Sequence, residues 1–245
     1  MDDSTIRRLN DINRRFYEVT ADEFDQTRGA SWPGWEELLP YLKQGTGSDV
    51  FSVLDVGCGN GRFGGFLAQR LRGAIDYHGV DSNPALLAHA RQALESLSGV
   101  RSKLEERDVV TSPLEDGQYN LVVMFGLMHH IPGYDHRRVF VRQMAERVKP
   151  GGWMAFACWR FYEYERFKKR IIPWPDDLAG TVEPHDYLLD WRRGAVAWRY
   201  CHYVDDAEHA ALVTASGLTE IHTFRADGFT GAVNKYSVLK KQNDR

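Results

Sequence analysis

The chain has 245 residues, of which 43% are hydrophobic and 27% are charged, a balance typical of a soluble globular protein with one large core. Its net charge of −3 gives no overall electrostatic attraction to nucleic acid. The opening MDDSTIRRLN lacks the apolar stretch of a signal peptide, and three scattered cysteines suit neither a disulfide framework nor a zinc knuckle. We therefore expect a cytoplasmic protein with reduced thiols.

The N-terminal part is expected to form a helical cap over residues 1–50. Ile6, Leu9 and Phe16 recur at helical spacing with arginines largely on the other side, which predicts an amphipathic helix. A shorter helix is expected at about 35–43, and a Gly/Ser break follows it.

From residue 51 onward, predicted strands alternate with predicted helices. The strands are expected at 51–56, 75–80, 100–107, 119–125, 152–159, 218–225 and 235–241. The helices are expected at 62–72, 84–97, 135–148 and 205–216. This alternation indicates an α/β fold with a mostly parallel sheet and right-handed crossovers. Because no helix separates the last two strands, they are expected to form an antiparallel hairpin at one edge.

Residues 160–200 interrupt the alternation. They are rich in Trp, Tyr, Phe and Arg and contain three prolines. We interpret them as an insertion after the fifth strand that lies over the carboxyl edge of the sheet, where open α/β sheets bind ligands. The alternative is a structural lid on the core. The core itself is then expected to comprise 51–159 and 201–245.

A glycine-rich loop joins the first predicted strand to the next helix in VLDVGCGNGRFGGFL, where residues 59–64 are a literal G-x-G-x-x-G. This pattern is typical of dinucleotide sites, in which Asp81 could bind the ribose. Asp55, however, would place a negative charge against the pyrophosphate. S-adenosylmethionine has no phosphate and carries an ammonium group, so it fits this loop better.

Three carboxylates at successive strand ends support this interpretation. Asp55 can bind the ammonium, Asp81 can accept from both ribose hydroxyls, and Asp108 can accept from the adenine amino group. The other expected cofactor contacts are Gly57, Cys58, Gly59, Gly61, Ser82, Val109, Phe125 and Gly126. The loop glycines let the backbone approach the ligand closely. The alternative for each aspartate taken alone is to cap a helix or close a turn, and for Asp108 this alternative is about equally favoured.

The segments VLDVGCGNGRF, GVDSN, RDVV, LMHHI and VKPGGWMAFACW resemble, in this order, the motifs of class I S-adenosylmethionine-dependent methyltransferases. The resemblance covers about residues 50–160. It implies a Rossmann-like fold with a seven-stranded, mostly parallel sheet and an antiparallel last strand. It also implies S-adenosylmethionine as the methyl donor.

The flanking segments resemble the tRNA wobble-uridine carboxymethyl methyltransferases. They are FYEVTADEFDQTRGASWPGW, ACWRFYEYE, HDYLLDW and RYCHYVDDAEHAALVTASGL. This resemblance implies methyl transfer to the carboxymethyl group at position 5 of a tRNA uridine. It also implies a small activating protein subunit, which the resembled enzymes use.

A carboxylate acceptor is already ionised at neutral pH, so it needs no general base, and a cation that orients it is more useful. Arg28 in TRGASWP and Arg199 in RYCH are the candidate cations. The alternative for each is a surface arginine whose stem packs on a tryptophan. If the acceptor were an amine or a hydroxyl, either His129 or His130 would be the natural base.

Three further residues are assigned to the acceptor side: Trp32, His130 and His202. Trp32 could instead staple the N-terminal segment to the core, and His130 could be a structural hydrogen-bonding group. The nine histidines show no metal-ligand spacing, so metal catalysis is not expected.

The acceptor class stays open at this point. A basic cluster, Arg166, Lys168, Lys169 and Arg170, could contact RNA phosphates, but nearby acidic residues nearly cancel its charge. The alternatives are a small-molecule O- or N-methyltransferase with 160–200 as a pocket lid, and a non-catalytic module that binds S-adenosylmethionine or supports a partner. A dehydrogenase is the least favoured.

Overall fold

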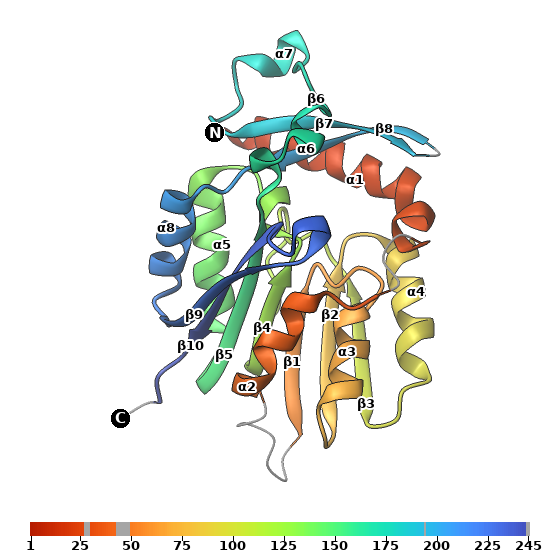
Figure 1. The fold of residues 1–245 in the computed structure, drawn as a ribbon, viewed down its shortest axis with the longest axis vertical. Coiled ribbons are helices and arrows are strands. Elements are labelled where there is room, and N and C mark those ends of the chain that lie inside the picture. Colours follow the sequence, from red (N-terminus) through yellow and green to blue (C-terminus); the bar gives the residue numbers. More distant parts are fainter. Residues whose placement is uncertain (27–29, 43–49, 194, 244–245) are drawn as a thin grey trace.

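The computed structural model describes residues 1–26, 30–42, 50–193 and 195–243. Its centre is a seven-stranded sheet with the strand order β3-β2-β1-β4-β5-β10-β9 (Figure 1). The strands are β1 (Phe51–Val56), β2 (Ile75–Asp81), β3 (Val100–Glu106), β4 (Tyr119–Phe125), β5 (Val148–Trp159), β9 (Thr219–Ala226) and β10 (Asn234–Lys240). The first five run parallel, and β10 pairs antiparallel with both β5 and β9. The predicted Rossmann-like sheet with an antiparallel last strand is confirmed.

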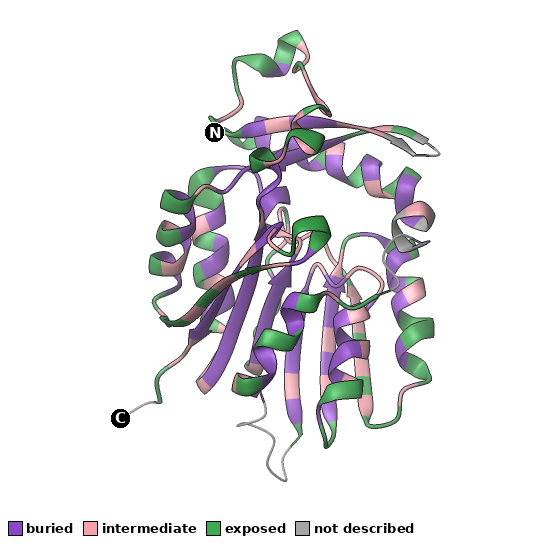
Figure 2. Ribbon diagram, viewed as in Figure 1, coloured by how far each residue is buried: buried purple, intermediate pink, exposed green. Residues whose placement is uncertain are grey.

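Helices cover both faces of this sheet. They are α2 (Leu39–Leu42), α3 (Arg62–Arg70) and α4 (Pro84–Glu95) on one face, and α5 (Tyr134–Glu146) and α8 (Asp206–Ser216) on the other. Val53 and Leu54, neighbours on β1, point into the two different cores, because successive side chains of a strand alternate between faces. Figure 2 accordingly shows the central strands mostly buried, whereas the outer sides of the helices are exposed.

Most element boundaries fall within two residues of the sequence prediction, because local capping signals mark them. The side chain of Asn83 caps α4 by accepting from the Leu86 N–H, and Pro84 follows it at the first helical position. Strand β5 is the exception. It begins at Val148 rather than at residue 152, so residues 148–151 also form part of the strand.

The region predicted as an aromatic insertion contains a second sheet. Strands β6 (Ile171–Ile172), β7 (Asp186–Arg193) and β8 (Ala195–His202) form an antiparallel three-stranded sheet. Strand β8 runs two residues beyond the expected boundary at 200. The sequence prediction missed these strands because the aromatic and proline content was interpreted as an irregular lid. Short helices η4 (Phe161–Glu163), α6 (Glu165–Lys168) and α7 (Asp176–Ala179) complete the region.

The N-terminal helix α1 (Asp3–Gln26) packs along β8. Figure 1 shows α1 and the three-stranded sheet at the top of the molecule, across the ends of the central strands. The remaining short helices are η1 (Pro33–Leu38), η3 (Met128–His130) and η5 (Gly228–Thr230). Within the described ranges, no helix combines the length and apolar character of a membrane-spanning segment.

Candidate active site

A cavity of about 550 Å³ opens at the carboxyl ends of β1, β2 and β4. Its walls come from the loops after these strands, from α1, from the three-stranded sheet with α6, and from the loop between β9 and β10. The chain order reverses between β1 and β4, which is the point where open α/β sheets bind their ligands.

The glycine loop forms the floor on the β1 side. Gly57 and Gly59 line the cavity with φ values of 77° and 53°, and a Cβ atom on Gly59 would meet nothing within 4 Å. Gly61 does not line the cavity. A Cβ atom at position 61 would lie 3.1 Å from the Cβ atom of Ala90. Glycine at this position therefore allows α3 to pack closely against α4, and the structure does not place it at the expected ligand contact.

Asp55 is the most deeply placed acid of the cavity, with 2% of its surface exposed. Burial raises its pKa to about 7; a hydrogen bond from the Tyr77 hydroxyl at 2.6 Å opposes this shift, and the charge of Asp81 adds to it. A carboxylate that loses so much hydration is stabilised by a cation beside it. An ammonium group in the cavity would meet this need.

Asp81 ends β2 and is held by backbone groups. Its two carboxylate oxygens accept from the N–H of Gly59 and the N–H of Asn83, each at 2.9 Å. Burial raises its pKa, and these backbone hydrogen bonds oppose the shift. Each oxygen retains a further acceptor position, so the oriented carboxylate can accept two hydroxyl donors from a vicinal diol. Ser82 lies beside it in the cavity wall.

Asp108 links the cavity to the N-terminal helix. It accepts from the side-chain amide of Asn10 at 2.6 Å and from the Val110 N–H at 3.0 Å. Asn10 and its α1 neighbours Asn13 and Tyr17 all line the cavity. The sequence prediction missed these three residues. Their spacing of three and four residues places their polar side chains on one face of the helix, which could have indicated a polar contact. The remaining expected cofactor residues in the wall are Cys58, Val109, Phe125 and Gly126.

Arg199 reaches the cavity from β8, and only 8% of its surface is exposed. Its guanidinium carbon lies 4.9 Å from the ring centroid of Trp159 and 5.2 Å from that of Phe16. Among the described residues, its Nε has no hydrogen-bond partner and no carboxylate forms an ion pair with it. Arg199 is therefore a buried cation, fixed by aromatic rings, with donor capacity left for a ligand.

Two histidines follow β4 and have different surroundings. His129 lines the cavity, and its ring centroid lies 5.4 Å from that of Trp159. His130 also borders the cavity, but its Nε2 lies 3.0 Å from the Tyr17 hydroxyl and its Nδ1 lies 3.1 Å from the Tyr200 carbonyl. Its two ring nitrogens thus tie α1 and β8 together, which supports the structural interpretation of this residue.

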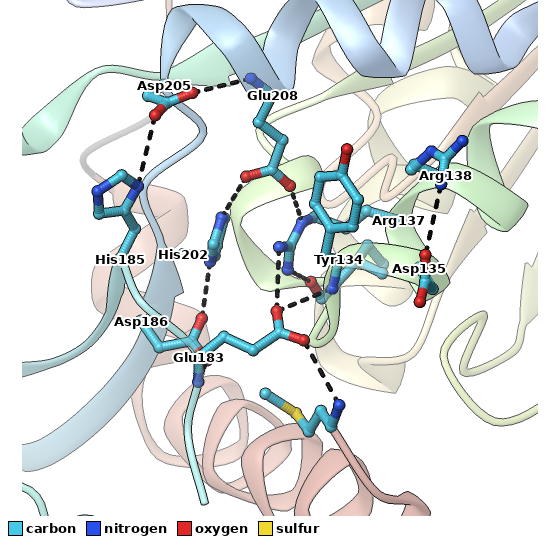
Figure 3. A network of polar contacts seen from close by, with 12 residues as sticks. Tyr134, Asp135, Arg137, Arg138, Glu183, His185, Asp186, His202, Asp205 and Glu208 are labelled. Atoms are coloured by element: carbon cyan, nitrogen blue, oxygen red, sulfur yellow. Dashed lines mark hydrogen bonds and ion pairs between the residues drawn. The ribbon is translucent and has the colours of Figure 1, made fainter.

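The structure places His202 away from the cavity lining, contrary to its expected role on the acceptor side. Figure 3 shows its ring between two acids: Nδ1 lies 2.7 Å from Asp186 and Nε2 lies 2.7 Å from Glu208. Burial lowers its pKa, but these two hydrogen bonds outweigh burial and the net pKa is raised. Glu208 also accepts from the fully buried Arg137 at 2.6 Å. The network joins the three-stranded sheet to α5 and α8.

The two expected residues of the N-terminal segment have different outcomes. Trp32 lines the cavity, stacks on Trp35 with ring centroids 5.5 Å apart, and has the Arg62 guanidinium over its ring. Arg28 lies outside the described residues, so its predicted role stays a prediction.

One group of side chains has the composition of a metal site. Among the described residues, ligand atoms of His129, His130 and Cys201 all lie within 4.8 Å of one another. Both nitrogens of His130 already have hydrogen-bond partners, and burial raises the pKa of the Cys201 thiol to about 11. Because Arg199 also bonds to Cys201, a cation placed here would face a guanidinium charge. This cluster is poorly suited to a metal ion.

Comparison with known proteins gives the class of this site. Residues 53–152 match the model of a methyltransferase domain. A protein of Encephalitozoon cuniculi that carries the name methyltransferase is 28% identical over 93% of this chain and 94% of its own length. A tRNA (carboxymethyluridine(34)-5-O)-methyltransferase of Arabidopsis thaliana is 25% identical over 64% of this chain, which matches only 35% of that protein.

Among solved structures, the N-methyltransferase NodS from Bradyrhizobium japonicum in complex with S-adenosyl-L-homocysteine has the same fold. It superposes with a TM-score of 0.59 over 98% of this chain and 99% of that one, at 17% sequence identity. The buried Asp55, the backbone-oriented Asp81 and the open glycine floor fit S-adenosylmethionine, the methyl donor expected from the sequence.

Proposed function

We propose that this chain, whose residues 53–152 match a methyltransferase domain and whose fold is that of a solved methyltransferase, uses S-adenosylmethionine to methylate a carboxylate, namely that of a 5-carboxymethyl wobble uridine in tRNA. The observation that carries the proposal is Arg199. A guanidinium that is buried, held between two aromatic rings and without a carboxylate partner among the described residues suits an anionic acceptor group.

When bound, the donor supplies a methyl group activated by its sulfonium centre. The protein groups orient the two reactants and exclude water. Asp55 pairs with the donor's ammonium, and Asp81 fixes its ribose hydroxyls. Arg199 presents two N–H groups in a planar fork to the acceptor carboxylate, so one carboxylate oxygen can point at the methyl group. No residue needs to remove a proton, because the acceptor is already ionised.

The proposal gives His129 a place in the wall of the acceptor half and no proton-transfer role. Its ring lies against Trp159, whose ring also contacts Phe167 at a centroid distance of 4.8 Å. These rings form an apolar environment around the reacting groups. Water therefore competes less with the acceptor for the hydrogen bonds of Arg199. An amine or hydroxyl acceptor would instead require His129 as a base.

A base-stacking surface at the mouth supports RNA as the carrier of the carboxylate. Phe229 lies in the cavity wall with 55% of its surface exposed, and the Arg166 guanidinium lies 4.5 Å from its ring centroid. Aromatic and arginine planes stack unpaired bases without requiring a defined sequence. The relative from Arabidopsis, which is named for the same acceptor, adds independent support.

The proposal is tested by incubating the protein with methyl-labelled donor, total tRNA and, separately, a tRNA-free small-molecule extract. Because the resembled enzymes use a small activating subunit, each assay is run with the chain alone and with a nuclease-treated protein extract of the source cells. We expect label in tRNA, with a yield that falls steeply as salt rises. Label confined to small molecules under both conditions would identify the enzyme as a small-molecule methyltransferase.

A further inference from the structure

Asp227 has a backbone conformation that is normally reserved for glycine. It follows β9 with φ 68° and ψ 170°, and among the described residues only His185 is another non-glycine with positive φ. A side chain in this region strains the backbone, and such strain persists only where surrounding contacts compensate for it. The contacts of the Asp227 side chain therefore indicate what the strained conformation is for.

The carboxylate of Asp227 is 5% exposed and accepts three hydrogen bonds. Oδ1 accepts from the Gly34 N–H at 2.8 Å, and Oδ2 accepts from the side chain of Asn234 at 2.8 Å and from the Tyr236 hydroxyl. Asn234 and Tyr236 belong to the central sheet, whereas Gly34 belongs to the separate η1 segment. Asp227, which lies 193 residues after Gly34 in the sequence, thus connects η1 to β10.

Gly34, which donates to Asp227, packs closely against the central sheet. A Cβ atom on Gly34 would lie 2.8 Å from the Tyr236 ring, so the η1 backbone sits directly on that ring. Two residues before it, Trp32 extends into the cavity, and a Cβ atom on Gly126 would lie 3.3 Å from its indole. The position of the Trp32 ring over Gly126 therefore depends on where Gly34 is held.

We propose that Asp227 is a positioning residue for the methyl-transfer site: through the Gly34 N–H it holds Trp32 in place as the wall over Gly126. Its carboxylate already serves three protein donors, so it acts through Trp32 and not by direct contact with the reactants. Because Gly126 is an expected contact of the methyl donor, this role moves Trp32 from the acceptor side, to which the sequence prediction assigned it, to the donor side, and it does not depend on which acceptor the enzyme uses.

The test measures S-adenosylhomocysteine affinity in a double-mutant cycle of Asp227→Asn and Trp32→Ala. The asparagine keeps the shape, but its amide nitrogen cannot accept from Asn234 and Tyr236. We expect Asp227→Asn to weaken binding about 3- to 10-fold in the wild-type background and to have no further effect in Trp32→Ala. Tyr236→Phe, which removes one donor and keeps the ring under Gly34, should give a smaller loss of the same kind.

A spectroscopic signal separates positioning from general stability. In protein labelled with 5-fluorotryptophan, the Trp32 resonance, assigned by Trp32→Phe, should shift or broaden in Asp227→Asn, while that of Trp174 stays unchanged. His185→Gly is the matched control, since it relieves the other positive φ outside the cavity wall and should leave the Trp32 resonance and the affinity unchanged. An unmoved Trp32 resonance, or affinity losses that multiply across the cycle, would overturn the proposal.

Discussion

The hydroxyl of Tyr77 on β2 donates a hydrogen bond of 2.6 Å to the carboxylate of Asp55 on β1. Burial raises the pKa of both groups, that of Asp55 to about 7 and that of Tyr77 well above its usual range. Tyr77 therefore keeps its proton and remains the hydrogen-bond donor to Asp55. One hydrogen bond does not replace the hydration that Asp55 loses, so we expect the ammonium group of S-adenosylmethionine to supply the remaining stabilisation of the carboxylate.

Replacing Asp55 by asparagine should have opposite effects on binding and on stability. Asn keeps the hydrogen bond from Tyr77 but offers no charge, so the affinity for S-adenosylmethionine should fall at least about tenfold. Without bound S-adenosylmethionine, Asp55→Asn should unfold at a higher temperature than wild type at pH 8, because the variant no longer buries the carboxylate charge of residue 55. Calorimetric titration and thermal unfolding check the two effects, and a lower melting temperature at pH 8 would contradict this explanation of the pKa of Asp55.

Donor affinity should depend on pH through the same group. Asp55 is neutral below about pH 7 in the donor-free protein, so binding the ammonium requires loss of its proton. Affinity should decrease as pH falls from 8 to 6, and binding at pH 6.5 should release protons. Calorimetry in buffers of different ionisation enthalpy measures the release. Asp55→Asn should lose both the slope and the release, and a wild-type affinity that is flat across this range would exclude Asp55 as the ammonium partner.

Asp81→Ala should weaken donor binding by about 1.5–3 kcal/mol, the cost of losing hydrogen bonds to a charged group. Asp76→Ala is the control, because Asp76 lies on the same strand but forms an ion pair with Arg101 outside the cavity. Its donor affinity should match wild type. Equal affinities of all three proteins would remove Asp81 from the ribose site.

Arg199 should affect turnover and leave donor affinity nearly intact. Arg199→Ala should lower kcat/KM for the acceptor roughly 10- to 100-fold, because one charge-assisted contact is lost. Arg199→Lys keeps the charge but loses the planar fork, so it should recover only part of the activity. Arg138→Lys serves as the control, because Arg138 is half-buried and lies outside the cavity lining. If Arg199→Lys were fully active, orientation by the fork would not be the role of this residue.

His202 should matter for stability alone. Its pKa is raised in the folded state, so its contribution is complete below about pH 6.5 and declines as pH rises through the folded value. His202→Gln should lower the melting temperature at pH 6, by an amount that shrinks as pH increases, because Asp186 and Glu208 lose a shared partner. Reduced turnover with unchanged stability would instead return His202 to the acceptor site.

The sequence was sufficient to predict the sheet and to select residues that mostly line one cavity, because both follow from local signals. Apolar runs that alternate with helical segments indicated the strands. Acidic residues at the ends of neighbouring parallel strands, such as Asp55 and Asp81, then come together at one edge of the sheet. Gly61 shows the limit of that reasoning. Its place in the glycine motif suggested a ligand contact, but its spatial neighbour is Ala90 of α4, which no local pattern reveals.

The acceptor half was harder to predict because long-range contacts build it. His202 and Arg199 lie three residues apart on one strand, so they point to opposite faces of the second sheet. Without the strand, which the aromatic content concealed, both looked like candidates for the same site. Asp227 gave no sequence signal at all, since its role depends on a hydrogen bond to Gly34 at the other end of the chain.

The most direct test of the central claim identifies the atom that receives the methyl group. Total tRNA methylated with labelled S-adenosylmethionine is digested to nucleosides, which are separated and treated with mild alkali. Methyl transfer to a carboxylate predicts label in a single nucleoside that coelutes with the methyl ester of 5-carboxymethyluridine and loses its label in alkali. Arg199→Ala should give little of it. Label that resists alkali, on a base nitrogen, a ring carbon or a ribose, would contradict the carboxylate acceptor.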